Sequence, residues 1–171
     1  MLLSFGKERI FEQTVRGYSA DLYRFAFWLC RDRFVAEDLV QETFLRAWNA
    51  WDKLRDRSVV KSWLISILRN EHARLYERKR FDYVDDQPED LAIAADHDPI
   101  ALFEIEQLIG ELPLSLREPF LLQTLGGFSC AEIADMLETS EGAVMVRLTR
   151  ARQTLRGLLK GEDVPARRER K

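Results

Sequence analysis

The sequence has few of the residues on which catalytic, metal-binding and disulfide-stabilised proteins depend. It contains two histidines and two cysteines in 171 residues, and Cys30 and Cys130 lie a hundred positions apart without a CxxC pair or a neighbouring histidine. Two isolated cysteines at apolar helical positions are most simply core thiols in a reducing compartment. Because a glycine-rich phosphate loop is also missing, we expect no catalytic residue, no metal site, no cofactor and no small-molecule substrate.

Long apolar runs and strand patterns are missing as well. No stretch reaches the ~18 apolar residues of a membrane span, and the N-terminal MLLSFGKERIF lacks the apolar run and cleavage site of a signal peptide. Alternating β-branched segments are absent, whereas apolar residues recur every three or four positions. With 46% hydrophobic and 32% charged residues, the composition is that of a globular chain. We therefore expect a cytoplasmic, all-α protein.

An overall excess of positive charge is missing too, since the formal net charge is −3. The negative charge is concentrated, however, because residues 82–98 contain seven carboxylates and no Lys or Arg. The remainder of the chain therefore has a net charge of +4. This segregation is a better guide to binding partners than the acidic total.

The apolar periodicity predicts two groups of helices. Helices are expected over roughly residues 6–31, 35–51 and 59–80, and another begins at Asp98 and Pro99, which are typical N-cap and first-turn residues, and ends at Pro113. The fold class is thus two small helical domains joined by an acidic flexible linker, the second containing a helix-turn-helix. The boundaries are an N-terminal domain 1–81, a linker 82–98, a C-terminal domain 99–161 and a basic tail 162–171.

Capping patterns place the helices of the second domain. Ser115 with Glu118, and Ser129 with Glu132, fit the S-x-x-E capping box. Ser140 opens the last helix, and its Glu141 suits the positive end of the helix dipole. The short turn between helices 129–137 and 141–156 has the length of a helix-turn-helix.

The last helix has one apolar side and one basic side. Val144, Leu148, Ala151 and Leu155 are expected to face the preceding helix. The opposite face is predicted to consist of Ala143, Val146, Arg147, Arg150 and Thr154. Its arginines suit DNA bases or phosphates, and its valine suits a thymine methyl group. An ordinary helical hairpin with a solvated arginine face is the alternative, which the caps and the outward valine disfavour.

The helix predicted over residues 35–51 has an unusual exposed surface. An apolar residue is surrounded there by carboxylates and an amide, and the set, here called the acidic face, consists of Asp38, Gln41, Glu42 and Leu45. Such a surface suggests a docking site for a basic protein partner. A solvated face with one stray leucine is an equally good interpretation of the periodicity.

The helix predicted over residues 59–80 combines an aromatic side chain with basic and amide groups. Its buried side is predicted to be Leu64, Ile67, Leu68 and Leu75. The other side presents Ser62, Ser66, Arg69 and Asn70, with Trp63 and Arg74 at the border. A stacking plane beside cations is what single-stranded DNA binding requires. The alternative is that Trp63 completes the core.

Four segments occur in an order that resembles a known family. They are AEDLVQETFLRAW, SWLISILRNEHARLYERKR, LPLSLREPFLL and FSCAEIADMLETSEGAVMVRLTRAR. This order resembles the extracytoplasmic-function group of bacterial sigma factors over nearly the whole chain. The resemblance implies a transcription initiation factor that binds core RNA polymerase and promoter DNA. It further implies an anti-sigma factor as a partner, which in the family is often linked to the membrane.

The resemblance also assigns roles to residues. It implies that the clamp helices of the largest polymerase subunit contact Asp38, Gln41, Glu42 and Leu45. It implies that the melted −10 element is captured by Lys61, Ser62, Trp63, Arg69, Asn70 and Arg74. It implies that the −35 duplex is read by Ser140, Glu141, Ala143, Val146, Arg147 and Arg150.

Two positions depart from the family pattern. Where the family usually has Thr, Val, Lys, Ser and Arg, this chain has AVMVR at residues 143–147, so we expect fewer phosphate contacts and an unusual −35 preference. Glu138 stands where glycine is common, and we expect a differently shaped turn because glutamate tolerates a left-handed conformation poorly.

Two alternative functions are considered. The chain could be a sigma-like mimic that sequesters an anti-sigma factor, or a simple helix-turn-helix regulator of transcription.

Overall fold

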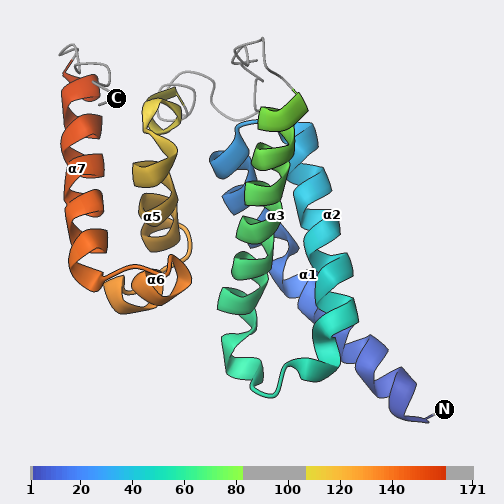
Figure 1. Cartoon of the computed structure of the whole chain (residues 1–171). Helices are drawn as coiled ribbons and strands as arrows, with labels where there is room; N and C mark the ends of the chain where they lie inside the picture. Colours follow the sequence, from blue (N-terminus) through green and yellow to red (C-terminus); the bar gives the residue numbers. More distant parts are fainter. Residues whose placement is uncertain (1, 83–106, 161–171) are drawn as a thin grey trace. The chain divides into compact units, whose positions relative to one another are not determined.

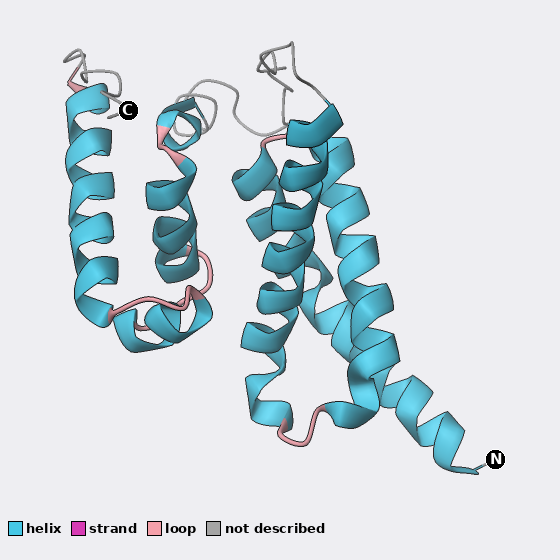
Figure 2. Cartoon of the chain, in the orientation of Figure 1, coloured by secondary structure: helices cyan, strands magenta, loops and turns pink. Residues whose placement is uncertain are grey.

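The computed structural model describes residues 2–82 and 107–160. Every regular element within these two ranges is a helix, and none is a strand (Figure 2). This confirms the all-α class predicted from the spacing of the apolar residues. None of the described helices is both long and apolar enough to cross a bilayer. The predicted linker from residue 83 onward, the helix start at residues 98–99 and the basic tail lie outside the described residues.

The N-terminal unit is built from three long helices, α1 (Leu2–Cys30), α2 (Arg33–Ala50) and α3 (Val60–Asp82), which pack against one another (Figure 1). Two short 3-10 turns, η1 (Trp51–Lys53) and η2 (Arg57–Val59), connect α2 to α3. Apolar side chains of all three helices form the core of this unit: Leu22, Phe25, Ala26, Leu29, Ala36, Leu39, Ala47, Val60, Leu64, Ile65 and Leu68. The predicted helices are present, although α1 begins several residues earlier than expected.

The sharp turn between α1 and α2 depends on two neighbouring residues. Arg31 adopts a left-handed conformation with φ of +57°, which ends α1. Asp32 then acts as the N-cap of α2, because its carboxylate accepts hydrogen bonds from the backbone N–H groups of Phe34 at 2.8 Å and Val35 at 3.0 Å. The two donors would otherwise have no partner within the helix. This turn sets the direction in which α2 returns along α1.

The C-terminal unit contains a helical segment at residues 107–111, followed by α5 (Leu114–Thr124), α6 (Cys130–Met136) and α7 (Glu141–Leu159). Helices α5 and α7 lie side by side, and α6 lies across one end of the pair (Figure 1). The core of the unit consists of Leu112, Leu121, Leu122, Phe128, Ile133, Ala134, Val144, Leu148 and Ala151. The predicted inward side of the last helix is therefore confirmed, with Leu155 half-buried at its edge.

The predicted caps of α6 and α7 are confirmed. Ser129 and Glu132 form a complete capping box, since each side chain bonds the backbone N–H of the other. The Ser140 hydroxyl accepts a hydrogen bond from the Ala143 N–H at 3.1 Å. The cap predicted at Ser115 is wrong. Helix α5 begins after Pro113, whose carbonyl accepts the first helical hydrogen bonds, so Ser115 already lies inside the first turn.

Gly126 allows α5 to turn closely into the segment before α6. A Cβ atom at this position would lie 2.4 Å from the Leu122 carbonyl oxygen and 2.5 Å from the Phe128 ring. Both distances are too short for any side chain. The next residue, Gly127, has φ of +73°, a conformation that favours glycine. The two glycines thus position the start of the helix-turn-helix.

Candidate functional site

The turn between α6 and α7 keeps the left-handed conformation of a helix-turn-helix. Glu138 has φ of +50°, and the Thr139 N–H donates to the Ala134 carbonyl at 3.0 Å. The expectation that glutamate here would change the shape of the turn is therefore wrong. The neighbouring hydrogen bond and the packing of α6 on α7 hold the residue in a conformation that costs about 1–2 kcal/mol for a residue with a Cβ.

The exposed surface of α7 is rotated from the predicted one. Of the predicted outward residues, Val146 and Arg150 are exposed, whereas Ala143, Arg147 and Thr154 are half-buried at the flank. Five further residues of α7 are exposed and are here called the outward stripe: Gly142, Met145, Val146, Thr149 and Gln153. Met145 lies about 90° round the helix from the buried side, and the other four lie about 130–170° from it. Met145 is 51% exposed and Val146 50% exposed. Periodicity located the helix correctly, but its outward direction was misjudged.

Two hydrogen bonds limit what this surface offers to a ligand. The Thr149 hydroxyl donates to the Met145 carbonyl at 2.9 Å, so its proton is used within the helix. The Arg152 guanidinium donates to the Gln123 side-chain oxygen on α5. Arg150, in contrast, is exposed and forms no ion pair within residues 107–160. Arg150 is therefore an available cation beside the start of the outward stripe.

The acidic face of α2 is exposed as predicted. Leu45 is 57% exposed, and Asp38 and Gln41 are also exposed. Phe34, which is 71% exposed, lies on the same side of the helix, because positions 34, 38, 41 and 45 follow the spacing of one helical stripe. Phe34 was not among the predicted residues of this face, although its spacing from Asp38 is that of one helical turn. The face therefore has an aromatic residue at one end and a leucine at the other.

Glu42 is not a free carboxylate on this face. Its Oε1 lies 2.7 Å from the Arg46 Nε atom, and the same Nε lies 2.7 Å from the Glu71 carboxylate on α3. Glu71 also pairs with Arg74 at 2.8 Å. These four residues form one ion-pair network between α2 and α3. The network joins the acidic face to the predicted −10 site, since Glu42 belongs to the first and Arg74 to the second.

The buried side of α3 differs in part from the prediction. Leu64 and Leu68 are buried as expected, but Ile67 and Leu75 are only half-buried. Ile65 takes an unexpected core position, and two polar residues, Glu71 and His72, are buried as well. Polar side chains are mostly exposed, so a polar residue in the core is hard to predict from the sequence. The pairing of Glu71 with Arg46 of α2, which helps to make its burial tolerable, could not be seen along one helix.

The exposed side of α3 brings together part of the predicted −10 site. Trp63, Asn70 and Arg74 share one flank, since they are seven and four residues apart. Ser62 and Arg69 are both half-buried and lie about 100° and 120° round the helix from Trp63, on one side of it. The Ser62 hydroxyl donates to the Val59 carbonyl at 3.0 Å. Lys61 is about 200° from Trp63 around α3 and is also half-buried, so the structure separates it from the group.

Trp63 is part of an aromatic cluster at the base of this flank. The centroid of its ring lies 6.1 Å from that of the buried Trp51 ring, and the Arg57 guanidinium lies 4.4 Å from the centroid of the Trp51 ring. Trp63 itself is half-buried, so it packs on the core and still presents part of its ring. In the loop before α3, Asp56 accepts hydrogen bonds from the Ser58 hydroxyl and the Ser58 backbone N–H. These bonds, the hydroxyl's first, lower the pKa of the Asp56 carboxyl below its usual value. The interpretation that Trp63 completes the core is thus confirmed in part, and its binding of single-stranded DNA stays a prediction.

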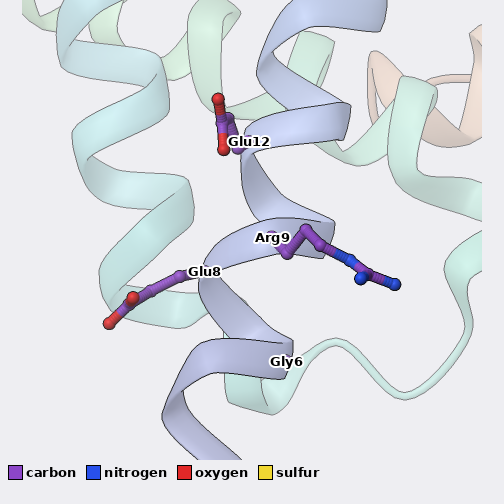
Figure 3. A pocket seen from close by; sticks show the side chains of 4 residues that line it. All are labelled: Gly6, Glu8, Arg9 and Glu12. Atoms are coloured by element: carbon purple, nitrogen blue, oxygen red, sulfur yellow. The ribbon is translucent and has the colours of Figure 1, made fainter.

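The described residues offer little else that resembles a ligand site. A shallow hollow on α1 is lined by Gly6, Glu8, Arg9 and Glu12 (Figure 3). Glu8 and Arg9 point to opposite sides of the helix, so their charges do not converge (Figure 3). Within residues 2–82 and 107–160 no three His, Cys, Asp or Glu side chains are grouped as a metal site. The three helical faces are the best candidates for function.

Comparison with known proteins identifies the family of both units. The chain matches the family model of Sigma-70 region 2 over residues 14–81 and that of Sigma-70, region 4, over residues 102–155. These ranges contain the acidic face, the α3 flank and all of the outward stripe of α7. The two matched regions also correspond to the two units of the structure.

Several relatives are similar along most of their length. The ECF RNA polymerase sigma factor SigM of Bacillus subtilis is 34% identical over 154 residues, which cover 86% of this chain and 93% of that protein. SigX of the same organism is 30% identical, covering 87% of this chain and 83% of the relative. The sigma factor RpoE of Bartonella quintana, solved in complex with the anti-sigma factor NepR, matches with a TM-score of 0.79 and 32% identity over 89% of this chain and 98% of that one. The chain therefore belongs to the extracytoplasmic-function family of bacterial RNA polymerase sigma factors, transcription initiation factors that direct the polymerase to specific promoters.

Proposed function

We propose that this sigma factor uses three separate helical faces. The acidic face of α2 binds the clamp helices of the largest subunit of core RNA polymerase. The flank of α3 around Trp63 captures the melted −10 strand, and α7 reads the −35 duplex. The observation that supports the assignment most strongly is the stripe on α2, where apolar side chains stand exposed next to acidic and amide groups.

Docking through α2 follows from the chemistry of its stripe. Phe34 and Leu45 are eleven residues apart, about 16 Å along a helix, and each would bury most of its apolar surface against a partner. Asp38 and Gln41 lie between them and can pair with basic or amide groups of that partner. Burial of a leucine or phenylalanine side chain contributes about 1.5–3 kcal/mol. We expect these two anchors, more than the already paired Glu42, to determine the affinity for polymerase.

Capture of the −10 strand would use stacking and charge rather than covalent chemistry. The exposed part of the Trp63 ring offers a plane for an unpaired base, Asn70 offers an amide, and Arg74 offers a cation for the phosphate backbone. Stacking on an aromatic side chain contributes about 1–3 kcal/mol per base. That gain offsets the cost of unstacking, which is a few kcal/mol per base. Arg69 and Ser62 would extend the site along the strand.

The chain would work with polymerase and under the control of a protein inhibitor. We infer that it supplies no catalytic residue, since polymerase provides the chemistry of RNA synthesis. We also propose an anti-sigma factor as a partner, because the similar RpoE and CnrH structures are complexes with the anti-sigma factor NepR and with the cytosolic domain of CnrY, respectively. A cytoplasmic location, with retention at the membrane by such a partner, follows as part of the same proposal.

Run-off transcription with core polymerase tests the proposal. Purified chain and core enzyme are expected to produce transcripts from a genomic fragment library that neither produces alone. Leu45→Ala and Phe34→Ala should each lower the affinity for core polymerase about tenfold or more. Ile10→Ala is the control, because Ile10 is an exposed apolar residue of α1 outside the three faces.

Other outcomes would favour the alternative functions. A sigma-like mimic would bind an anti-sigma factor without binding core polymerase. A simple helix-turn-helix regulator would bind duplex DNA without polymerase and would give no transcript dependent on this chain. Equal losses in Ile10→Ala and Leu45→Ala would refute the docking role of the acidic face.

A further inference from the structure

The outward stripe of α7 begins with apolar groups. Met145 and Val146 are each about half exposed, at 51% and 50%, and Thr149 is exposed one turn further along. Gly142 precedes them in the first turn, and a Cβ placed there would meet nothing within 4 Å. The first turns of α7 therefore present exposed methyl and methylene groups on this side of the helix.

This surface has few side-chain donors for hydrogen bonds to base edges. Met145 and Val146 have no N–H or O–H group. Thr149 already donates its hydroxyl proton to the Met145 carbonyl, which leaves its methyl group and an acceptor. Arg152 is bound to Gln123, and Arg147 is half-buried on the flank. Among the described residues, Arg150 is the nearest exposed cation to the stripe.

Base pairs differ in what they present to such a surface. Guanine and adenine are usually distinguished by bidentate hydrogen bonds from Arg, Asn or Gln, whereas thymine alone presents a C5-methyl group in the major groove. An apolar stripe cannot form the first kind of contact, but it can contact the methyl group. Met145 and Val146 are consecutive residues whose side chains leave the helix about 100° apart, so the two can contact neighbouring base pairs, which are about 3.4 Å apart.

We propose that Met145 and Val146 determine −35 specificity by contacting the methyl groups of thymines at two adjacent base pairs. Arg150 beside them binds a phosphate of the same duplex. The inference rests on the proposed function, in which α7 enters the major groove of the −35 element. It explains what the chain reads at positions where its family usually has lysine and serine.

The surrounding charge favours DNA over a protein as the occupant of this stripe. Arg150 and Arg156 are exposed along the same helix, and Glu141 is its one acidic residue. Glu141 lies in the first turn, where it complements the helix dipole. Cations flanking an apolar strip match a groove whose floor has methyl groups and whose edges are phosphates. A protein partner on the stripe is the alternative occupant.

Replacing thymine with uracil tests the proposal, because uracil lacks only the methyl group. Promoters with a randomised −35 hexamer are first selected by transcription with the reconstituted holoenzyme, and we expect neighbouring thymines on one strand to be enriched. Each thymine-to-deoxyuridine replacement should then weaken transcription at limiting holoenzyme about fourfold, as expected for losing one buried methyl group. In Met145→Ala or Val146→Ala the same replacement should have a smaller effect at the base pair which that residue contacts.

Controls and contrary results separate the inference from the proposed function. Leu159→Ala is the matched control, since Leu159 is a 70% exposed apolar residue at the far end of α7, and it should retain the full response to uracil. If transcription depends on the −35 sequence but uracil replaces thymine without loss, the inference is overturned while the proposed role of α7 remains. If transcription does not depend on the −35 sequence at all, both are overturned. If Met145→Ala weakens binding of an anti-sigma factor and leaves promoter selection unchanged, the stripe is a protein-binding surface.

Discussion

Glu71 offers a direct test of how the N-terminal unit is held together. Its carboxylate lies 2.7 Å from the Arg46 Nε atom and 2.8 Å from the Arg74 Nη1 atom, and its side chain is only 10% exposed. Hydrogen bonds to charged groups contribute about 1.5–3 kcal/mol, and exposed ion pairs about 0.2–1 kcal/mol. Because the arginines are 44% and 60% exposed, we assign about 1 kcal/mol to each. Glu71→Gln should therefore lower the free energy of unfolding by about 2 kcal/mol.

Urea unfolding followed by tryptophan fluorescence measures this change. All four tryptophans of the chain lie between residues 28 and 63, so the signal reports the N-terminal unit alone. Glu12→Gln is the matched control. The Glu12 carboxylate lies 2.6 Å from the Arg16 guanidinium, but both side chains are well exposed, at 59% and 78%. We expect this variant to lose less than about 0.5 kcal/mol.

Equal losses of stability in Glu71→Gln and Glu12→Gln would contradict this explanation. Burial, rather than the short distance, is what makes the Glu71 pairs stabilising in this account. An unchanged stability of Glu71→Gln would mean that desolvation of the carboxylate cancels its pairing, as is known for some buried ion pairs. Either result would contradict the view that the Glu71 ion pairs stabilise the packing of α2 on α3.

Three further changes test the C-terminal unit, which contains no tryptophan and is followed by circular dichroism. Gly126→Ala should lower the free energy of unfolding of the C-terminal unit by about 1–3 kcal/mol or more, because the added Cβ would meet the Leu122 carbonyl oxygen at 2.4 Å. An unchanged unfolding curve would contradict the close approach of Gly126 to this oxygen. Glu138→Gly should stabilise the unit by up to about 1 kcal/mol by relieving the left-handed strain, less the flexibility that glycine gives the unfolded chain, and a loss of stability would show that Glu138 is not strained. Hydrogen bonds from the Ser129 backbone N–H and hydroxyl lower the pKa of Glu132 below the usual 4.5. The contribution of the Glu132 carboxylate to stability is therefore complete above that pH and is lost as the pH falls through its lower folded-state pKa. The stability of Glu132→Gln should fall less between about pH 5 and 3 than that of the wild type, and an equal fall would contradict the cap.

Local signals in the sequence were sufficient to predict most of the fold. The three- and four-residue spacing of apolar side chains predicted the helices, because a helix places such residues on one side. The capping box of Ser129 and Glu132, and the cap at Ser140, depend on residues only three apart, so they could be recognised without tertiary information. The failed cap at Ser115 shows the limit of such patterns, since Pro113 had already determined where α5 begins.

The exposed residues of the three candidate faces were predicted less completely. Leu45 and its neighbours were identified, because exposure on one helix follows from the periodicity of that helix. Phe34 was missed although it lies on the same stripe. The outward side of α7 was misjudged, since its half-buried flank depends on the packing of α5 and α6. A helical wheel specifies directions around one axis but not which of them another helix covers.

The all-helical class, the positions of the helices, the family and the general location of three candidate faces could be predicted from the sequence alone. These follow from contacts within a few residues and from the order of the motifs. Only the tertiary structure showed that Glu71 is buried between two arginines, that Lys61 lies apart from Trp63, and that Met145 and Val146 of α7 are exposed while Arg147 is half-buried. The physical reason is that burial and ion pairing depend on neighbours distant in the chain, which a local pattern does not specify.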